Sequence, residues 1–213
     1  SHAGFSYDKE GITLNGWDIN ANPNVDFMVA DIAKNKRGNE DNYAYNGVPT
    51  LFRHKLARVS VKAKLDDAYE NKTINLTSVE LTNIKTKGNY VNNNWMGQGA
   101  PENIQVYNDA SGLLLNKDAA IEIGTQKRIV MPQALAQDAY FKIKYNLTTT
   151  IAGGGTDTQL IEKDILIKNV TPAWYTNNDI TYTLIISLGT NYIEFDTSVT
   201  DWVGYGNMDL TIE

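Results

Sequence analysis

The sequence contains no cysteine and only two histidines, and these shortages exclude several kinds of site. Without cysteine there is no disulfide, no thiolate metal site and no cysteine nucleophile. The histidines are His2, near the start of the chain, and His54, so neither an HExxH motif nor a histidine-based zinc site is present. A Ser-His-Asp catalytic triad would have to use His54. That residue alternates onto the same side as Phe52 and Leu56, which favours a structural role.

Basic residues and long apolar runs are also scarce. The chain has 19 Lys and Arg against 25 Asp and Glu, a formal net charge of −6. Phosphate binding needs a basic surface, so this balance argues against nucleic acid as a partner. No apolar run reaches the roughly 18 residues typical of a membrane-spanning helix. The chain begins Ser-His-Ala-Gly, without Met or a signal-peptide pattern, and we expect a processed or cloned fragment.

The sequence does contain long two-residue alternations, the clearest of them at residues 48–65. From Ala57 to Leu65 every odd position is apolar and every even position is charged or polar. This is the pattern of a half-buried antiparallel strand. Before it the apolar side falls on the even positions, so the phase changes near Leu56. We expect a bulge there, or a bend from one sheet into another.

Further alternating segments predict an all-β protein, and its 12 Tyr, 4 Trp and many Thr and Asn fit strands and turns. Gly153-Gly-Gly155 predicts a hairpin connection. Residues 86–118, dominated by Asn, Gly and isolated aromatics, predict a long loop with at most one short strand. With 213 residues, one large sandwich or two small ones are open. The other predicted strands cover residues 25–30, 74–84 (with a phase change after Leu76), 121–123, 127–131, 140–147, 160–170, 182–188, 192–195 and 208–212.

Carboxylate pairs are present, but none has a pattern that distinguishes a glycosidase pair from surface charge. A β-sandwich hydrolase stays an alternative only if Asp179 and Glu194 converge in a cleft. A hard-cation site from the oxygens of residues 39–42 is a second alternative. We expect no catalytic residue, no cofactor and no metal site. The pairs are Asp66 with Asp67, Glu40 with Asp41, and Asp179 with Glu194.

Three aromatic residues in the predicted loop, Tyr90, Trp95 and Tyr107, are candidates for a glycan platform. Coplanar exposed rings would let sugars stack on them, and the protein would then be a carbohydrate-binding β-sandwich module. The other interpretation is that these rings fill the ends of sheets. Both remain open from the sequence.

Five segments occur in this order along the chain: Asp26-Phe-Met-Val-Ala30, the strand at 48–61, Met131-Pro132-Gln133, Trp174 with Tyr182, and Asp201-Trp202. Taken in order, they resemble the strand signature of the fimbrillin-like proteins, the type V pilins and related surface proteins of Bacteroides-type bacteria. The resemblance covers about residues 25–202. The family usually has a Gly between its Trp and its Tyr, and here Asn177-Asn178 occupies that place.

The resemblance implies a fold of transthyretin-like, two-layer antiparallel β-sandwich domains. It places the C-terminal part of a first domain at residues 1–66 and a second domain at residues 67–213. It also implies a non-enzymatic fimbrial or cell-adhesion subunit of the cell surface. Such a subunit is exported as a lipoprotein precursor, and a lipid anchor on the precursor is its only link to the outer membrane.

Subunits of this family join by donor-strand exchange, so the resemblance implies other pilin subunits as partners. Host or bacterial surface proteins or glycans are the implied adhesion targets. Strand exchange satisfies the unpaired backbone groups of a groove and fills its apolar pockets. The candidate donor strand here is residues 208–212, with Met208, Leu210 and Ile212 on one side. The alternative is that this segment is an ordinary edge strand of its own domain.

Overall fold

The structure is a computed structural model, and it describes residues 4–8, 11–31, 51–124, 127–188 and 192–202. Within these residues every regular element is a strand, which confirms the all-β prediction. In the same residues there is no helix with the length and apolarity to cross a membrane.

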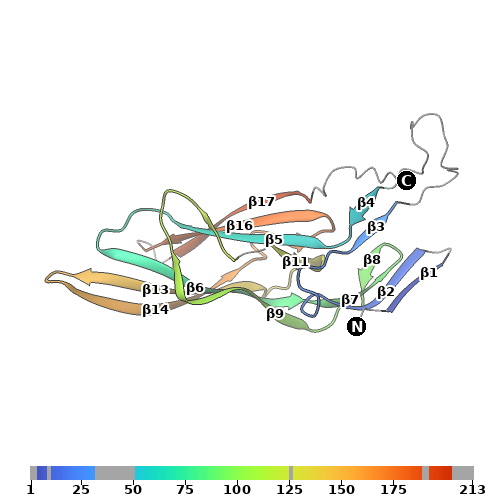
Figure 1. Ribbon diagram of the computed structural model, residues 1–213, viewed down its shortest axis with the longest axis horizontal. Helices are drawn as coiled ribbons and strands as arrows, with labels where there is room; N and C mark the ends of the chain where they lie inside the picture. The colour runs from blue at the N-terminus through green and yellow to red at the C-terminus, as the bar shows by residue number, and fades with distance from the viewer. Residues whose placement is uncertain (1–3, 9–10, 32–50, 125–126, 189–191, 203–213) are drawn as a thin grey trace, which may run out of the picture.

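Two sheets form the body of the molecule, one above the other in Figure 1. The strand pair β5 (Ala57–Leu65) with β16 (Asn178–Ser187) is parallel, and the other described pairs are antiparallel. One sheet has the order β10-β5-β16-β17, with β11 beside β5, and consists of Ile121–Glu122, Ala57–Leu65, Asn178–Ser187, Tyr192–Asp201 and Arg128–Val130 (β11). The other has the order β14-β13-β6-β9 and consists of Gly155–Leu166, Tyr140–Ile151, Lys72–Lys85 and Pro101–Leu114.

A smaller sheet, called the end sheet below, lies at one end of this body with a short two-stranded ladder beside it (Figure 1). The end sheet has the order β1-β2-β7-β8 and consists of Gly4–Asp8, Gly11–Asp18, Lys87–Val91 and Asn94–Met96. The ladder pairs β3 (Met28–Ala30) with β4 (Phe52–His54). A further short pair joins β12 (Gln133–Ala134) to β15 (Ala173–Trp174).

The alternating segment of the sequence forms β5, as predicted. Its odd-numbered side chains are at most 6% exposed and belong to the main hydrophobic cluster. The phase change near residue 56 is confirmed, because β4 pairs with β3 whereas β5 pairs with β16. Leu56 and Ala57 are both fully buried where the chain passes from the β3–β4 ladder into the sheet that contains β5.

Two other local predictions are confirmed. The phase change in the strand at residues 74–84 corresponds to a register shift between β6 and β13, where Thr77 is skipped between Leu76 and Ser78. A β-bulge of this kind moves the following side chains to the other face. The predicted hairpin joins β13 to β14, and Gly153 and Gly154 have φ angles of 104° and 95° in its turn. Such positive angles favour glycine.

The prediction of a long loop at residues 86–118 is wrong, because β7, β8 and β9 occupy most of this stretch. β7 and β8 form a hairpin in which Asn92 and Asn93 adopt φ angles of 48° and 67°. Asparagine tolerates this left-handed region better than most residues. In β9 only Ile104 and Val106 are buried, and its pairing with β6 shifts register three times. The strand therefore has little alternation in its sequence.

The predicted division of the chain after residue 66 and the transthyretin-like topology stay predictions. Strand β5, from the proposed first part, pairs with β16, from the proposed second part, from Arg58 opposite Asp179 to Leu65 opposite Ile186. Residues on both sides of the proposed boundary also belong to one hydrophobic cluster. The two parts thus share a sheet and a core.

A buried aromatic pair, Trp174 and Tyr182, lies in this core. The indole Nε1–H of Trp174 donates a hydrogen bond to the Tyr182 hydroxyl at 2.9 Å, and both side chains are at most 1% exposed. The Tyr182 ring also contacts Phe141 edge to face, with ring centroids 5.2 Å apart. The pair fixes β15 against β16.

We expect Tyr182→Phe to lower the free energy of unfolding by about 1–3 kcal/mol, because it keeps the ring but leaves the Trp174 N–H unpaired in the core. Urea unfolding measures this. Tyr175→Phe is the matched control, since Tyr175 is 66% exposed, and it should change stability by less than about 0.5 kcal/mol. Equal effects of the two substitutions would contradict the role of the hydrogen bond.

Candidate functional site

Some of the residues selected from the sequence lie outside the described part of the structure. They include the candidate donor strand with Met208, Leu210 and Ile212, and the possible cation ligands at residues 39–42. Among the residues that the structure describes, no group of three or more His, Cys, Asp or Glu is placed to hold a metal ion.

The candidate glycan platform is split between two sheets. Tyr90 and Trp95 lie opposite each other on β7 and β8, with ring centroids 5.3 Å apart. Tyr90 is only 1% exposed, and its burial raises the pKa of its phenol to about 12. Phe27 packs edge to face against both rings. Tyr107 lies on β9, in the β14-β13-β6-β9 sheet. Glycan binding by the three residues stays a prediction, and Tyr90 offers no exposed ring face for it.

The end sheet carries a row of apolar side chains that runs from the buried cluster to its outer edge. Trp95 lies opposite Tyr90, Tyr90 opposite Leu14, and Leu14 opposite Phe5 on β1. Residues opposite each other in a sheet share a face. Exposure rises along this row, from 1% at Tyr90 through 5% at Leu14 to 59% at Phe5. Tyr7, two residues further along β1, is 78% exposed.

Strand β1 is also an open edge of its sheet. It pairs with β2 on one side, and within the described ranges no strand pairs with its other side. Alternate backbone N–H and C=O groups of an edge strand lack partners and form a template for another strand. An open edge and an exposed apolar row therefore coincide at β1.

His54 is held by a carboxylate and an indole. Its Nδ1 lies 2.5 Å from Asp26 Oδ2, and its ring stacks on Trp202 with centroids 4.0 Å apart and planes inclined by 6°. The Arg58 guanidinium lies 4.9 Å from the same indole. Among the described residues no Ser or Thr hydroxyl is hydrogen-bonded to His54, so the described contacts do not form a Ser-His-Asp arrangement. The stack connects β4 to the end of β17.

The two carboxylates that a hydrolase would need do not converge. Asp179 is on β16 and lies opposite Arg58 of β5. Glu194 is on β17 and lies opposite Ile185 of β16. Six strand positions separate residues 179 and 185, which corresponds to roughly 20 Å. Asp179 instead accepts hydrogen bonds from Arg58 at 2.5 Å and Lys127 at 3.0 Å. Burial raises the pKa of its carboxyl, but these two cations lower it by more, and the net pKa lies below 3.8.

Fold and site together define a class: an all-β protein of stacked sheets in which the described edge strand β1 exposes aromatic side chains. Comparison with known proteins identifies the family. A family model described as fimbrillin-like matches residues 6–202. The chain belongs to the fimbrillin-like family, as the sequence signature indicated. No curated protein matches the chain.

Solved structures share the fold. A fimbrial protein from Bacteroides vulgatus matches with a TM-score of 0.59 and 18% identity, over 74% of this chain and 57% of its own. A candidate cell adhesion protein from Bacteroides uniformis matches with a TM-score of 0.52 and 20% identity, over 93% of this chain and 69% of its own. This chain therefore spans between half and three quarters of the length of these two proteins.

We expect Asp179→Asn to lower the free energy of unfolding by about 1–3 kcal/mol at neutral pH, because Arg58 and Lys127 lose their anionic partner. The lowered pKa of Asp179 means that its stabilising effect is present above the unfolded-state value of 3.8 and is lost as the pH falls below it. Urea unfolding at neutral pH and well below pH 3.8 should therefore show a difference from the wild type that shrinks on acidification.

Asp164→Asn on the exposed face of β14 is the matched control for this substitution. It should leave stability within about 0.5 kcal/mol of the wild type at neutral pH. A loss caused by Asp179→Asn that is independent of pH would contradict the ion-pair explanation.

Proposed function

We propose that this chain is a non-enzymatic fimbrial or cell-adhesion subunit of a bacterial surface, and that it docks to neighbouring subunits by β-strand addition. Membership in the fimbrillin-like family supports the fimbrial role. The fold shared with a Bacteroides fimbrial protein is consistent with it. The proposed location is a fimbrium on the outer membrane, reached by a lipoprotein precursor. Host or bacterial surface proteins or glycans are the proposed adhesion targets.

The open edge of β1 is the observation that carries the proposal. A strand laid beside β1 would receive hydrogen bonds from backbone groups that have no strand partner among the described residues. Its apolar side chains would continue the row that ends at Phe5. Covering an exposed Phe or Tyr ring contributes about 1.5–3 kcal/mol before ordering costs. Addition at this edge is therefore favoured by both backbone and side-chain terms.

The proposed donor is the segment at residues 208–212 of another subunit. Its apolar residues, Met208, Leu210 and Ile212, alternate with Asp209 and Thr211. A strand needs this period of two to place all its apolar side chains on one face of a sheet. The two faces of such a strand differ in chemistry, so its apolar face would lie on the same side of the sheet as Phe5.

Substitution at the β1 edge tests the acceptor. Phe5→Asp places a charge on the apolar row and should abolish assemblies that resist SDS without heating, and should return the chain to monomer in size-exclusion chromatography. Ser6→Asp is the matched control, because Ser6 lies on the opposite face of the same edge strand. It should leave assembly within about twofold of the wild type. Equal assembly by the two variants would refute addition at β1.

Substitution in the C-terminal segment tests the donor. Met208→Asp, Leu210→Asp and Ile212→Asp combined should abolish assembly, because charged side chains cannot enter an apolar row. Asp209→Asn combined with Thr211→Ser changes the other face of the same segment and should preserve it. If the triple Asp variant still forms SDS-resistant assemblies, another segment is the donor. This conclusion holds even where Phe5→Asp still blocks assembly.

A further inference from the structure

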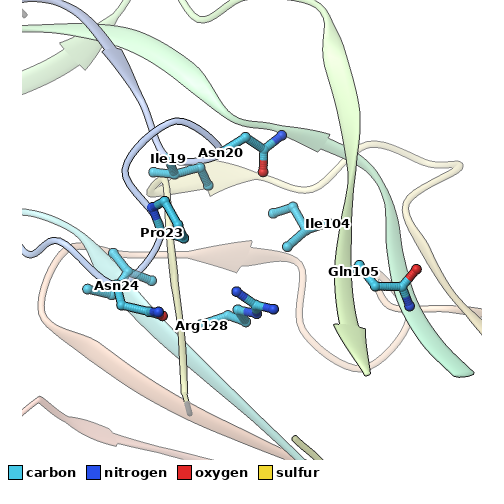
Figure 2. A pocket seen from close by; sticks show the side chains of 8 residues that line it. Ile19, Asn20, Pro23, Asn24, Ile104, Gln105 and Arg128 are labelled. Atoms are coloured by element: carbon cyan, nitrogen blue, oxygen red, sulfur yellow. The ribbon is translucent and has the colours of Figure 1, made fainter. Parts of the chain in front are cut away.

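A pocket lined by Arg128 lies where β9, β11 and the β2–β3 connection meet. Its volume is about 340 Å³. Three segments far apart in the sequence line it: Ile19 and Asn20 after β2, Ile104 on β9, and Arg128 on β11. Figure 2 shows the Arg128 side chain extending toward Ile104, with Ile19 and Asn20 across the pocket from it. The apolar part of the wall is aliphatic.

Arg128 contributes the positive charge of this pocket. It is half-buried, and within the described parts of the chain no carboxylate lies within ion-pair distance of its guanidinium. The neighbouring Lys127 and Arg58 are both satisfied by Asp179. Acidic residues outnumber basic ones in this chain, 25 to 19, so an unpaired arginine is not explained by a shortage of anions. A partly desolvated guanidinium is favourable chiefly when an anion pairs with it.

The nearby acidic group does not serve this purpose. Glu102 accepts hydrogen bonds from Lys87 at 2.5 Å, Thr86 at 2.7 Å and Asn20 at 2.8 Å. The Lys87 contact is the largest cause of the low pKa of Glu102, which is about 2. Its charge is therefore compensated by Lys87. The contact uses the amide nitrogen of Asn20 and leaves its Oδ1 as an acceptor.

We propose that this pocket binds a carboxylate carried on a polypeptide beside an aliphatic side chain. A guanidinium offers two parallel N–H donors that match the two oxygens of a carboxylate. Ile19, Ile104 and the nearby Ile129 provide an aliphatic surface for the neighbouring side chain. Asn20 Oδ1 and the side chain of Asn24 provide polar contacts for backbone amides. No aromatic ring lines the pocket, so the stacking surface typical of a sugar site is absent from its lining.

The ligand differs from the strand that β1 would accept. Strand addition uses backbone groups along an edge, whereas this pocket recognises one acidic side chain and one aliphatic neighbour. The two sites use different residues, Phe5 on β1 and Arg128 on β11. A variant of one therefore leaves the other intact, and each proposal fails or holds by itself.

NMR titration of the isotopically labelled chain tests the proposal, with N-acetyl-Leu-Glu-amide as the probe and N-acetyl-Leu-Gln-amide as its uncharged counterpart. We expect saturable shifts of the Arg128 Nε–H signal and of the Asn20 and Asn24 side-chain amides with the acidic peptide. Affinity for the Gln peptide should be at least about tenfold weaker, because a charge-assisted pair is lost. Arg128→Gln should abolish the shifts at Asn20 and Asn24.

Two further variants separate shape from charge. Arg128→Lys keeps the charge but loses the paired donors, so its affinity should lie between those of the wild type and Arg128→Gln. Lys72→Gln removes one positive charge from an exposed position on β6 and should bind as the wild type does. An unchanged amide spectrum elsewhere shows that each variant is folded.

Several outcomes would overturn the proposal. Equal affinity for the Glu and Gln peptides would exclude recognition of the carboxylate. Equal affinity for acetate and for the acidic peptide would exclude the aliphatic contact. Tighter binding of glucuronate than of the peptide would assign the pocket to an acidic sugar. Shifts that persist in Arg128→Gln would place the binding elsewhere.

Discussion

Burial of one face of β5 is the constraint on which the rest of the structure depends. The odd-numbered side chains from Ala57 to Leu65 are almost completely removed from water, and burial of apolar surface is the dominant favourable term in folding. In the sheet, β16 lies on one side of β5, and β10 and β11 lie on the other. The same registers place Asp179 opposite Arg58, and Arg128 opposite Val59.

The edge strands β14 and β1 differ in the side chains that they expose. β14 is an edge of its sheet in the described structure, and exposed charges such as Glu162 and Asp164 occur along it. Charge on an edge strand opposes unwanted pairing with other chains. β1 is also an edge, but its outward side chains include Phe5 and Tyr7. Leu160 and Leu166 are exposed on β14 as well, but Glu162 and Asp164 lie between them on the same face. Phe5 and Tyr7 are consecutive on one face of β1 with no charge between them, and this contrast is why we assign assembly to β1.

Sequence patterns predicted the elements whose side chains alternate between core and solvent. β5 was predicted from Ala57 to Leu65, and the β13–β14 hairpin from its glycines, because burial and turn geometry act locally there. β1 was not recognised as a strand, and β9 lies within the stretch that was predicted as a loop. In β9 repeated register shifts remove the alternation. In β1 the aromatic residues remain exposed, so no burial pattern sets their period.

The sequence by itself determined the all-β class, the family signature and the absence of thiol and histidine-based metal chemistry, because each depends on residue identity or on local spacing. Only the tertiary structure decided which strands became neighbours. Arg58 and Asp179 are separated by 121 positions and meet through the parallel pairing of β5 with β16. The exposure of Phe5 and the lack of an ion-pair partner for Arg128 among the described residues also result from the folding of the whole chain. Such contacts depend on the packing of distant segments, which no local pattern encodes.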